Sequence, residues 1–182
     1  MSTIEDLVAA YRRHVSRPWD ASLAGDQKVW FVVYDPAQER RLRFRISEFE
    51  AATRAADRHW LHIDLTDAFA TWMHAQRHRE AYFDDPENAV YALNQFREDG
   101  VARILREALS SAEADERTVV AVTGVGSLFG LVRVSEVIDA VAPDIRGRLA
   151  IFFPGSYDEK SYYRLFDARD GWDYHAVPIT AS

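Results

Sequence analysis

The 182-residue sequence contains no cysteine. Disulfide bonds, thiolate metal sites, iron–sulfur clusters and a cysteine nucleophile are therefore excluded. The other residues form no complete metal-binding or cofactor-binding motif. We therefore expect neither a metal nor another cofactor.

Long apolar runs and excess positive charge are also absent. No stretch reaches the roughly 18 apolar residues that a membrane-spanning helix needs. The first residues, MSTIEDLVAAYRRHV, mix acidic with apolar side chains, unlike a signal peptide. The formal net charge is −7, which disfavours binding to nucleic acid by the chain as a whole. We expect a cytoplasmic protein without membrane contact.

What the sequence does contain is typical of a packed globular protein. Hydrophobic residues make up 48% of the chain, including five Trp, eight Tyr and ten Phe. The length favours a single domain with one sizeable core. We expect one α/β domain over residues 1–182, with an N-terminal helix and loop at 1–27 and a sheet-and-helix core at 28–182.

Five short apolar segments predict strands, and helical patterns separate them. The expected strands are 28–34, 60–65, 118–122, 148–153 and 174–179. Parallel strands need long crossover connections, so this alternation predicts a mostly parallel sheet in a single three-layer domain. The strand order cannot be deduced from the pattern.

The helices are expected at sites with clear start signals. A first helix follows Thr3, a second of about 20 residues follows Asp35, and a third follows Thr66 and extends to about His78. A fourth starts after Asp85 and is kinked or divided at Gly100. A last helix occupies part of 128–141.

The loop after the third strand, TGVGSLFG, has the layout of a phosphate loop but fails each specific template. A Walker loop needs four residues between its glycines and then a lysine, whereas five lie between Gly124 and Gly130 and Leu131 follows. A dinucleotide fingerprint needs glycine at Phe129. A nucleophile elbow needs glycine on both sides of Ser127, two residues away, and finds Val125 and Phe129. With no complete catalytic motif, we expect no enzyme activity.

Backbone N–H groups of the same loop could still bind an anion. Gly124, Gly126 and Ser127 are the candidate residues, with Asp35 or Asp64 available to hold a metal. The alternative, which we favour, is that the glycines only permit a tight turn.

Two other clusters have both a functional and an ordinary interpretation. His74 and His78 are four residues apart and could begin a metal site, although a solvated helix face is favoured. The arginines of ERRLRFR (39–45) could meet phosphate, or pair with acidic neighbours such as Glu48 and Glu50.

The segment 152–175 is long for a connection and rich in aromatic residues. Its side chains could form a partner-binding surface or a flap packed on the sheet, and both interpretations stay open. The candidate contact residues are Tyr157, Tyr162, Tyr163 and Trp172.

The segments VTGVGSLFGLVRVSEVID, GRLAIFFPGSY and YYRLFDARDGWDYHAVPI resemble the BrxB family of BREX bacteriophage-exclusion systems. The resemblance extends from about VWFVVYDP to the end of the sequence. It implies an accessory component of a defence locus, with no established catalytic residue to carry over. Other BREX subunits are the implied partners, and the alkaline-phosphatase-like PglZ protein is the first candidate. A P-loop-NTPase-like architecture without Walker motifs fits both the residue patterns and the family resemblance.

Two functions from different classes therefore follow from the sequence. The leading one is a non-catalytic assembly component that acts through protein–protein interaction. The alternative is a nucleotide- or phosphate-binding protein with weak or no hydrolase activity, which uses the Gly124–Gly130 loop. Nucleic-acid contact through the arginine cluster is a third, less favoured, option.

Overall fold

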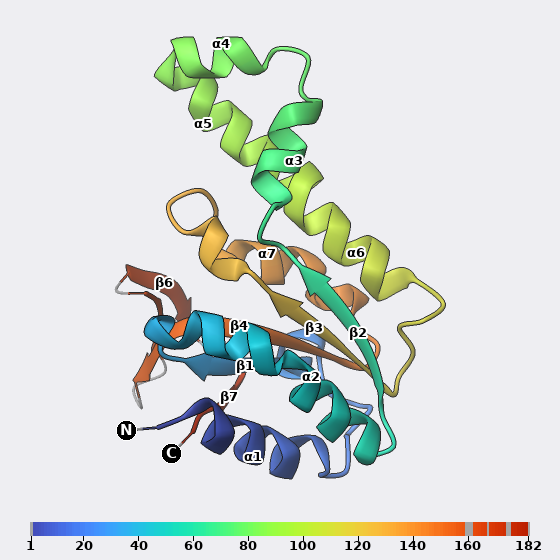
Figure 1. Cartoon of the computed structure of the whole chain (residues 1–182). Helices are drawn as coiled ribbons and strands as arrows, with labels where there is room; N and C mark the ends of the chain where they lie inside the picture. Colours follow the sequence, from blue (N-terminus) through green and yellow to red (C-terminus); the bar gives the residue numbers. More distant parts are fainter. Residues whose placement is uncertain (1, 159–161, 167, 174–175, 182) are drawn as a thin grey trace.

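The computed structural model describes residues 2–158, 162–166, 168–173 and 176–181 (Figure 1). For Pro86, Tyr162 and residues 168–173 it describes the backbone alone. Five parallel strands form the central sheet in the order β2-β3-β4-β1-β7. They are β1 (Val29–Tyr34), β2 (His59–Asp64), β3 (Thr118–Thr123), β4 (Arg148–Asp158) and β7 (Val177–Ile179). Four of the predicted strands are confirmed, and the fifth, predicted at 174–179, is confirmed over Val177–Ile179, while residues 174 and 175 lie outside the described part of the chain.

The side chains of the central strands alternate between two cores, one on each face of the sheet. In β1, Phe31 and Val33 belong to one core, and Trp30 and Val32 belong to the other. Burial on both faces explains why these strands are continuous apolar runs in the sequence. Helices cover both faces, so the predicted α/β fold with three layers is confirmed (Figure 1).

Seven α-helices and five short 3₁₀ or π segments are present among the described residues. One face carries α1 (Ile4–Val15) and α2 (Glu39–Ala55). The remaining α-helices are α3 (Ala68–Ala75), α4 (Arg79–Asp84), α5 (Pro86–Gln95), α6 (Arg103–Ser110) and α7 (Val134–Val141). The short segments are η1 (Gly25–Lys28), η2 (Pro36–Gln38), η3 (Phe96–Ala102), η4 (Val125–Leu128) and η5 (Ala142–Asp144).

Three of the predicted helix starts are confirmed by their caps. The Thr3 side chain accepts from the backbone N–H of Asp6 at 3.2 Å. Asp35 and Asp85 each accept from the backbone N–H two residues ahead, at 2.9 and 3.0 Å. These side chains satisfy donors that the first helical turn leaves free.

The prediction between residues 66 and 78 was wrong in two respects. The Thr66 side chain does not cap α3 but donates to Asp64, and Asp67 precedes the helix. The third helix ends at Ala75, and the separate helix α4 follows it. The predicted division of the next helix near Gly100 is confirmed, because Gly100 lies in the π segment η3, which separates α5 from α6. A Cβ at Gly100 would lie 2.5 Å from the Phe96 ring, so glycine is needed there for close packing.

The segment that follows the fourth predicted strand is more regular than a loop. β4 extends to Asp158 and pairs antiparallel with β5 (Tyr162–Leu165), which pairs with β6 (Ala168–Asp173). The long connection therefore carries its own small antiparallel sheet. No helix in the described ranges is long and apolar enough to cross a membrane.

Candidate functional site

The carboxyl ends of the parallel strands lie at one edge of the sheet, and the chain changes direction there between β4 and β1. The connection after β1 leads to β2, whereas the connection after β4 leads the opposite way to β7. Open α/β sheets bind ligands at such a switch point. A cleft of about 530 Å³ occupies this place, and Asp35, Gly155, Ser156 and Thr180 line it at the strand ends.

The chemistry of this cleft does not favour an anion. The segment η2 and the helix α2 begin here, and free backbone donors at a helix start attract anions. The Asp35 carboxylate, however, accepts from the N–H of Ala37, and the Glu39 carboxylate follows in the next turn. Since Glu39 is paired with Arg43, the Asp35 carboxylate is the charge at this helix start that opposes a phosphate by repulsion.

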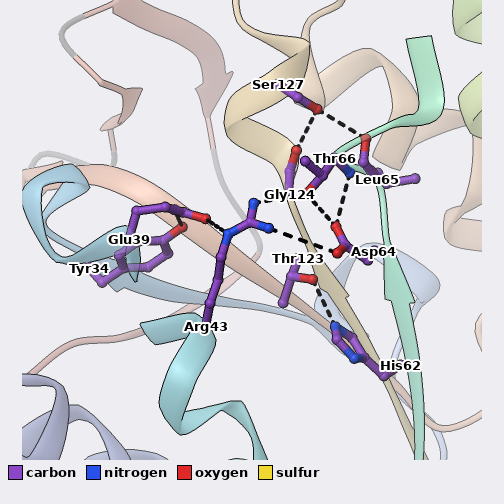
Figure 2. A network of polar contacts seen from close by, with 10 residues as sticks. All are labelled: Tyr34, Glu39, Arg43, His62, Asp64, Leu65, Thr66, Thr123, Gly124 and Ser127. Carbon is purple, nitrogen blue, oxygen red and sulfur yellow. Dashed lines mark hydrogen bonds and ion pairs between the residues drawn. The ribbon is translucent and has the colours of Figure 1, made fainter. Parts of the chain in front are cut away.

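An arginine of α2 links the ends of β1 and β2 (Figure 2). Arg43 donates from Nε to Glu39 at 2.7 Å and from Nη2 to the Thr66 hydroxyl at 2.8 Å, and its Nη1 lies 4.0 Å from the Asp64 carboxylate. Glu39 also accepts from the Tyr34 hydroxyl. The hydrogen bond to Glu39 raises the pKa of Arg43, and burial together with Glu39 raises the pKa of Tyr34. The guanidinium of Arg43 is thus bonded to side chains of the same protein.

The polar side chains at the end of β2 are also hydrogen-bonded within the protein. Asp64 Oδ1 accepts from the N–H and the hydroxyl of Thr66, at 2.9 and 2.5 Å. Burial acts to raise the pKa of Asp64, but the bonds from Thr66 and the charge of Arg43 outweigh it and lower that pKa. His62 Nε2 lies 2.7 Å from the Thr123 hydroxyl, and burial lowers the pKa of His62.

The glycine loop fits tightly between the ends of β2 and β3. Gly124 has φ = 78°, and a Cβ there would lie 2.5 Å from the Thr66 nitrogen and 2.6 Å from Asp64 Oδ1. The Ser127 hydroxyl donates to the carbonyl oxygens of Gly124 and Leu65, at 2.7 and 3.0 Å. These contacts support the tight-turn interpretation of the loop.

The helix after the glycine loop is not placed as anion binding would require. The loop passes into η4, which has only four residues, and α7 begins later, at Val134. Gly126 lies beside the ring of Phe166, whose Cζ would be 3.0 Å from an added Cβ. Gly124, Gly126 and Ser127 therefore border packed atoms of the same chain.

The proposed metal ligands do not converge. Asp35 caps η2, while Asp64 binds Thr66 at the end of a different strand. His74 lies in α3 and His78 precedes α4, so the two exposed histidines do not share a helix as the sequence analysis assumed. No group of three His, Asp or Glu side chains able to hold a metal occurs in the part of the chain that the structure describes.

The arginine cluster is largely paired with carboxylates. Arg41 and Arg45 both contact Glu5 of α1, the latter at 3.2 Å, and Arg45 also lies 3.4 Å from Glu48. Arg148 does not extend this patch, because it is buried at the opposite edge of the sheet, where β4 begins. The cluster is thus the charged surface of α2, as the ordinary interpretation predicted.

The predicted aromatic contact residues have different surroundings. Tyr163 is only 1% exposed and its hydroxyl donates to the carbonyl of Ala176 at 3.1 Å, so it lies in the core and not on a partner-binding surface. Tyr157 is half-buried, with its ring 4.9 Å from that of Tyr163. The side chains of Tyr162 and Trp172 lie outside the described part of the structure.

One group of exposed apolar residues was not predicted from the sequence. Phe83, Val90 and Tyr91 of α4 and α5 are 74%, 63% and 60% exposed. Their sequence, AYFDDPENAVY, places apolar side chains among carboxylates, outside the spacing of a single buried helix face. That departure was the available signal.

The fold and its polar edge define the class of this protein: a three-layer α/β domain whose strand-end loops are fastened to one another. Within that class the chain belongs to the BrxB family, because the family model described as BREX protein BrxB matches residues 62–179. The resemblance inferred from the sequence is confirmed, and membership makes the chain a component of a BREX phage-defence system. A search of curated proteins and a search of solved structures each gave no match.

Proposed function

We propose that this chain is a non-catalytic assembly component of a BREX system and acts by binding another protein of that system. One observation carries the proposal: the polar groups at the carboxyl edge are bonded to one another. Arg43 joins Glu39 and Thr66, and the Ser127 hydroxyl joins two backbone carbonyls. A catalytic base or nucleophile must instead reach a bound substrate.

We further propose that the sheet is a P-loop-NTPase-like architecture that lacks Walker motifs. In such a fold a phosphate loop joins a strand to a helix at the switch point. The corresponding turn here, between β1 and α2, reads Asp35-Pro36-Ala37-Gln38. It offers neither the glycines nor the lysine that grip a phosphate, which supports a role without nucleotide hydrolysis.

The family supports the choice of partners. Other BREX subunits are the proposed partners, and the alkaline-phosphatase-like PglZ protein is the first candidate, in a cytoplasmic complex. Direct binding to nucleic acid is not expected from the arginine cluster, since Glu5, Glu39 and Glu48 already neutralise much of its charge.

Co-expression with the other subunits of a BREX locus tests this function. The tagged chain should retain at least one of them through affinity capture and size-exclusion chromatography. The isolated chain should show no rise in melting temperature with ATP, GTP or NAD at millimolar concentration. Recovery of the chain alone, together with a clear nucleotide-induced shift, would contradict the proposal.

The cleft at the switch point favours one second candidate, a small-molecule binder. Its volume of about 530 Å³ lies within the range of ligand pockets. The version predicted from the sequence, a nucleotide or phosphate bound at the Gly124–Gly130 loop, concerns a different place, because that loop is not part of the lining of this cleft. The Asp35 carboxylate argues against an anion in the cleft, and the internal bonds of Ser127 argue against an anion at the loop. The same thermal-shift measurement distinguishes the two functions.

A further inference from the structure

The hairpin of α4 and α5, residues 79–95, extends away from the sheet, and we call it the arm (Figure 1). Its second helix continues through η3 into α6. The later part of this helical stretch packs in the core through Phe96, Leu105 and Leu109. The earlier part extends beyond the carboxyl edge of the sheet, where α4 lies against α5 (Figure 1).

The arm exposes large apolar side chains that do not pack against the rest of the chain. Phe83, Val90 and Tyr91 are all at least 60% exposed, while Ala92 is the one buried side chain among those described in the arm. A helix of six residues such as α4 is marginal in water without tertiary contacts. Clusters of exposed apolar side chains, tyrosine among them, mark protein-binding surfaces. The arm therefore has the exposed apolar side chains of a protein-binding surface.

A groove continues this surface toward the glycine loop. It has a volume of about 490 Å³ and lies between α5 and the loop after β3. Val90, Asn94 and Arg97 are spaced at i, i+4 and i+7, so the exposed side of the arm leads into the groove. Phe129 of the loop is 48% exposed. The lining includes Leu93, Asn94, Arg97, Phe129, Leu131 and Arg133.

The charge of the arm restricts what can bind to it. The arm carries the four carboxylates of Glu80, Asp84, Asp85 and Glu87 and one cation, Arg79, at its first residue. A second copy of the chain would bring the same four carboxylates against them if two arms met. An anionic membrane or a nucleic acid would also be repelled. The complementary surface is apolar and carries basic side chains.

We infer that the arm and its adjoining groove form the docking surface for a different BREX protein, whose contact segment is apolar and flanked by Lys or Arg. This inference rests on the proposed function and adds the surface and the chemistry of the partner. Phe83 and Tyr91 are the anchors, because large aromatic side chains carry most of the binding energy of such interfaces. The four carboxylates supply orientation and a faster encounter.

The test uses the subunit that affinity capture identifies, purified and titrated calorimetrically against the full-length chain. Phe83→Ser combined with Tyr91→Ser should weaken binding by about 100-fold or more. Phe44→Ser is the matched control, since Phe44 is 87% exposed but lies on α2, and it should change the Kd by less than about threefold. All three substituted side chains are exposed, so the melting temperatures should stay close to that of the wild type.

A second pair of substitutions tests the charge argument without altering the apolar anchors. Asp84→Asn combined with Glu87→Gln should weaken binding about tenfold at low salt, and the difference should nearly disappear near 1 M salt. Asp85 is left unchanged because it caps α5.

The possible outcomes separate this inference from the function on which it rests. If the wild-type chain retains no subunit, the proposed function fails and the inference fails with it. If the wild type binds a subunit and the arm variants bind equally well, only the docking surface is overturned. Self-association that Phe83→Ser abolishes would instead identify a second copy as the occupant. Binding to vesicles of anionic phospholipid would identify a membrane, and either result would overturn the inference.

Discussion

The Ser127 hydroxyl lies 3.0 Å from the carbonyl oxygen of Leu65 and donates a hydrogen bond to it, so the glycine loop is fastened to the chain that leaves the neighbouring strand. The same hydroxyl reaches the carbonyl of Gly124 at 2.7 Å. A serine that a phosphate or an acyl group would need is thus occupied within the turn. This bond explains how the loop can resemble a phosphate site while its serine stabilises the fold.

Substitution of Gly124 should destabilise the fold far more than substitution of Gly130. Both residues have positive φ, 78° and 76°, but only at Gly124 would a Cβ meet neighbouring atoms, at 2.5 to 2.6 Å. We expect Gly130→Ala to cost about 1 kcal/mol from the backbone conformation, and Gly124→Ala about 3 kcal/mol or more. Urea unfolding measures both. Equal costs would mean that the close approach of Gly124 to Asp64 and Thr66 is not required for stability.

Ser127→Ala should lower stability without affecting function. The loss of the hydroxyl leaves two carbonyls with one donor fewer, which we expect to cost about 1 kcal/mol in the free energy of unfolding. Capture of the partner subunit should be unchanged. Ser156→Ala, at an exposed position on β4, is the matched control for stability. Phosphate or nucleotide binding by the wild type that a folded Ser127→Ala protein loses would favour the anion-binding alternative.

Tyr163 should behave as a core residue. Tyr163→Ala removes a buried ring and should destabilise the chain by about 3–5 kcal/mol, whereas Tyr163→Phe loses the hydrogen bond to Ala176 and should cost about 1 kcal/mol. Denaturant unfolding distinguishes the two. Weaker partner binding by Tyr163→Phe, at unchanged stability, would restore this residue to the partner-binding surface.

Stability should fall as the pH decreases from about 6.5 to about 4. Burial, reinforced by the charges of Arg17 and Arg148, lowers the pKa of His14 from 6.5 to about 4. The unfolded chain therefore takes up a proton at higher pH than the folded chain, and each proton bound only by the unfolded state reduces the free energy of unfolding. His62, whose pKa burial also lowers, adds to the same decline.

The variant His14→Gln should make this part of the pH profile flatter. Urea midpoints between pH 4 and pH 7 measure the effect. The same slope in His14→Gln and in the wild type would show that His14 does not titrate differently on unfolding.

The framework of the fold was predictable because its signals are local. The β-branched and aromatic runs of β1 and β3 are buried on both faces, and Asp35 and Asp85 stand directly before prolines that begin helices. Strand order depends instead on which helix covers which face. That choice is made by contacts far apart in the sequence, such as Tyr11 with Thr53.

The candidate site was less predictable for a related reason. The composition of the loop identified Gly124, but its tight fit depends on Asp64 and Thr66, which lie some sixty residues earlier in the chain. The density of tyrosines suggested a surface at Tyr163, whereas the β5 pairing turns that side chain into the core. The exposure of Phe83 and Tyr91 follows from the projection of the arm, and its local sequence signal is limited to the departure of AYFDDPENAVY from the spacing of a buried helix face.

The central claim is that this BrxB-family chain acts by binding another BREX protein. The most direct measurement is the composition of the complex that the tagged chain forms when every subunit of a BREX locus is expressed with it. We predict one other subunit retained in a fixed stoichiometric ratio through size-exclusion chromatography. Elution of the chain alone, with all the other subunits present and folded, would contradict the account.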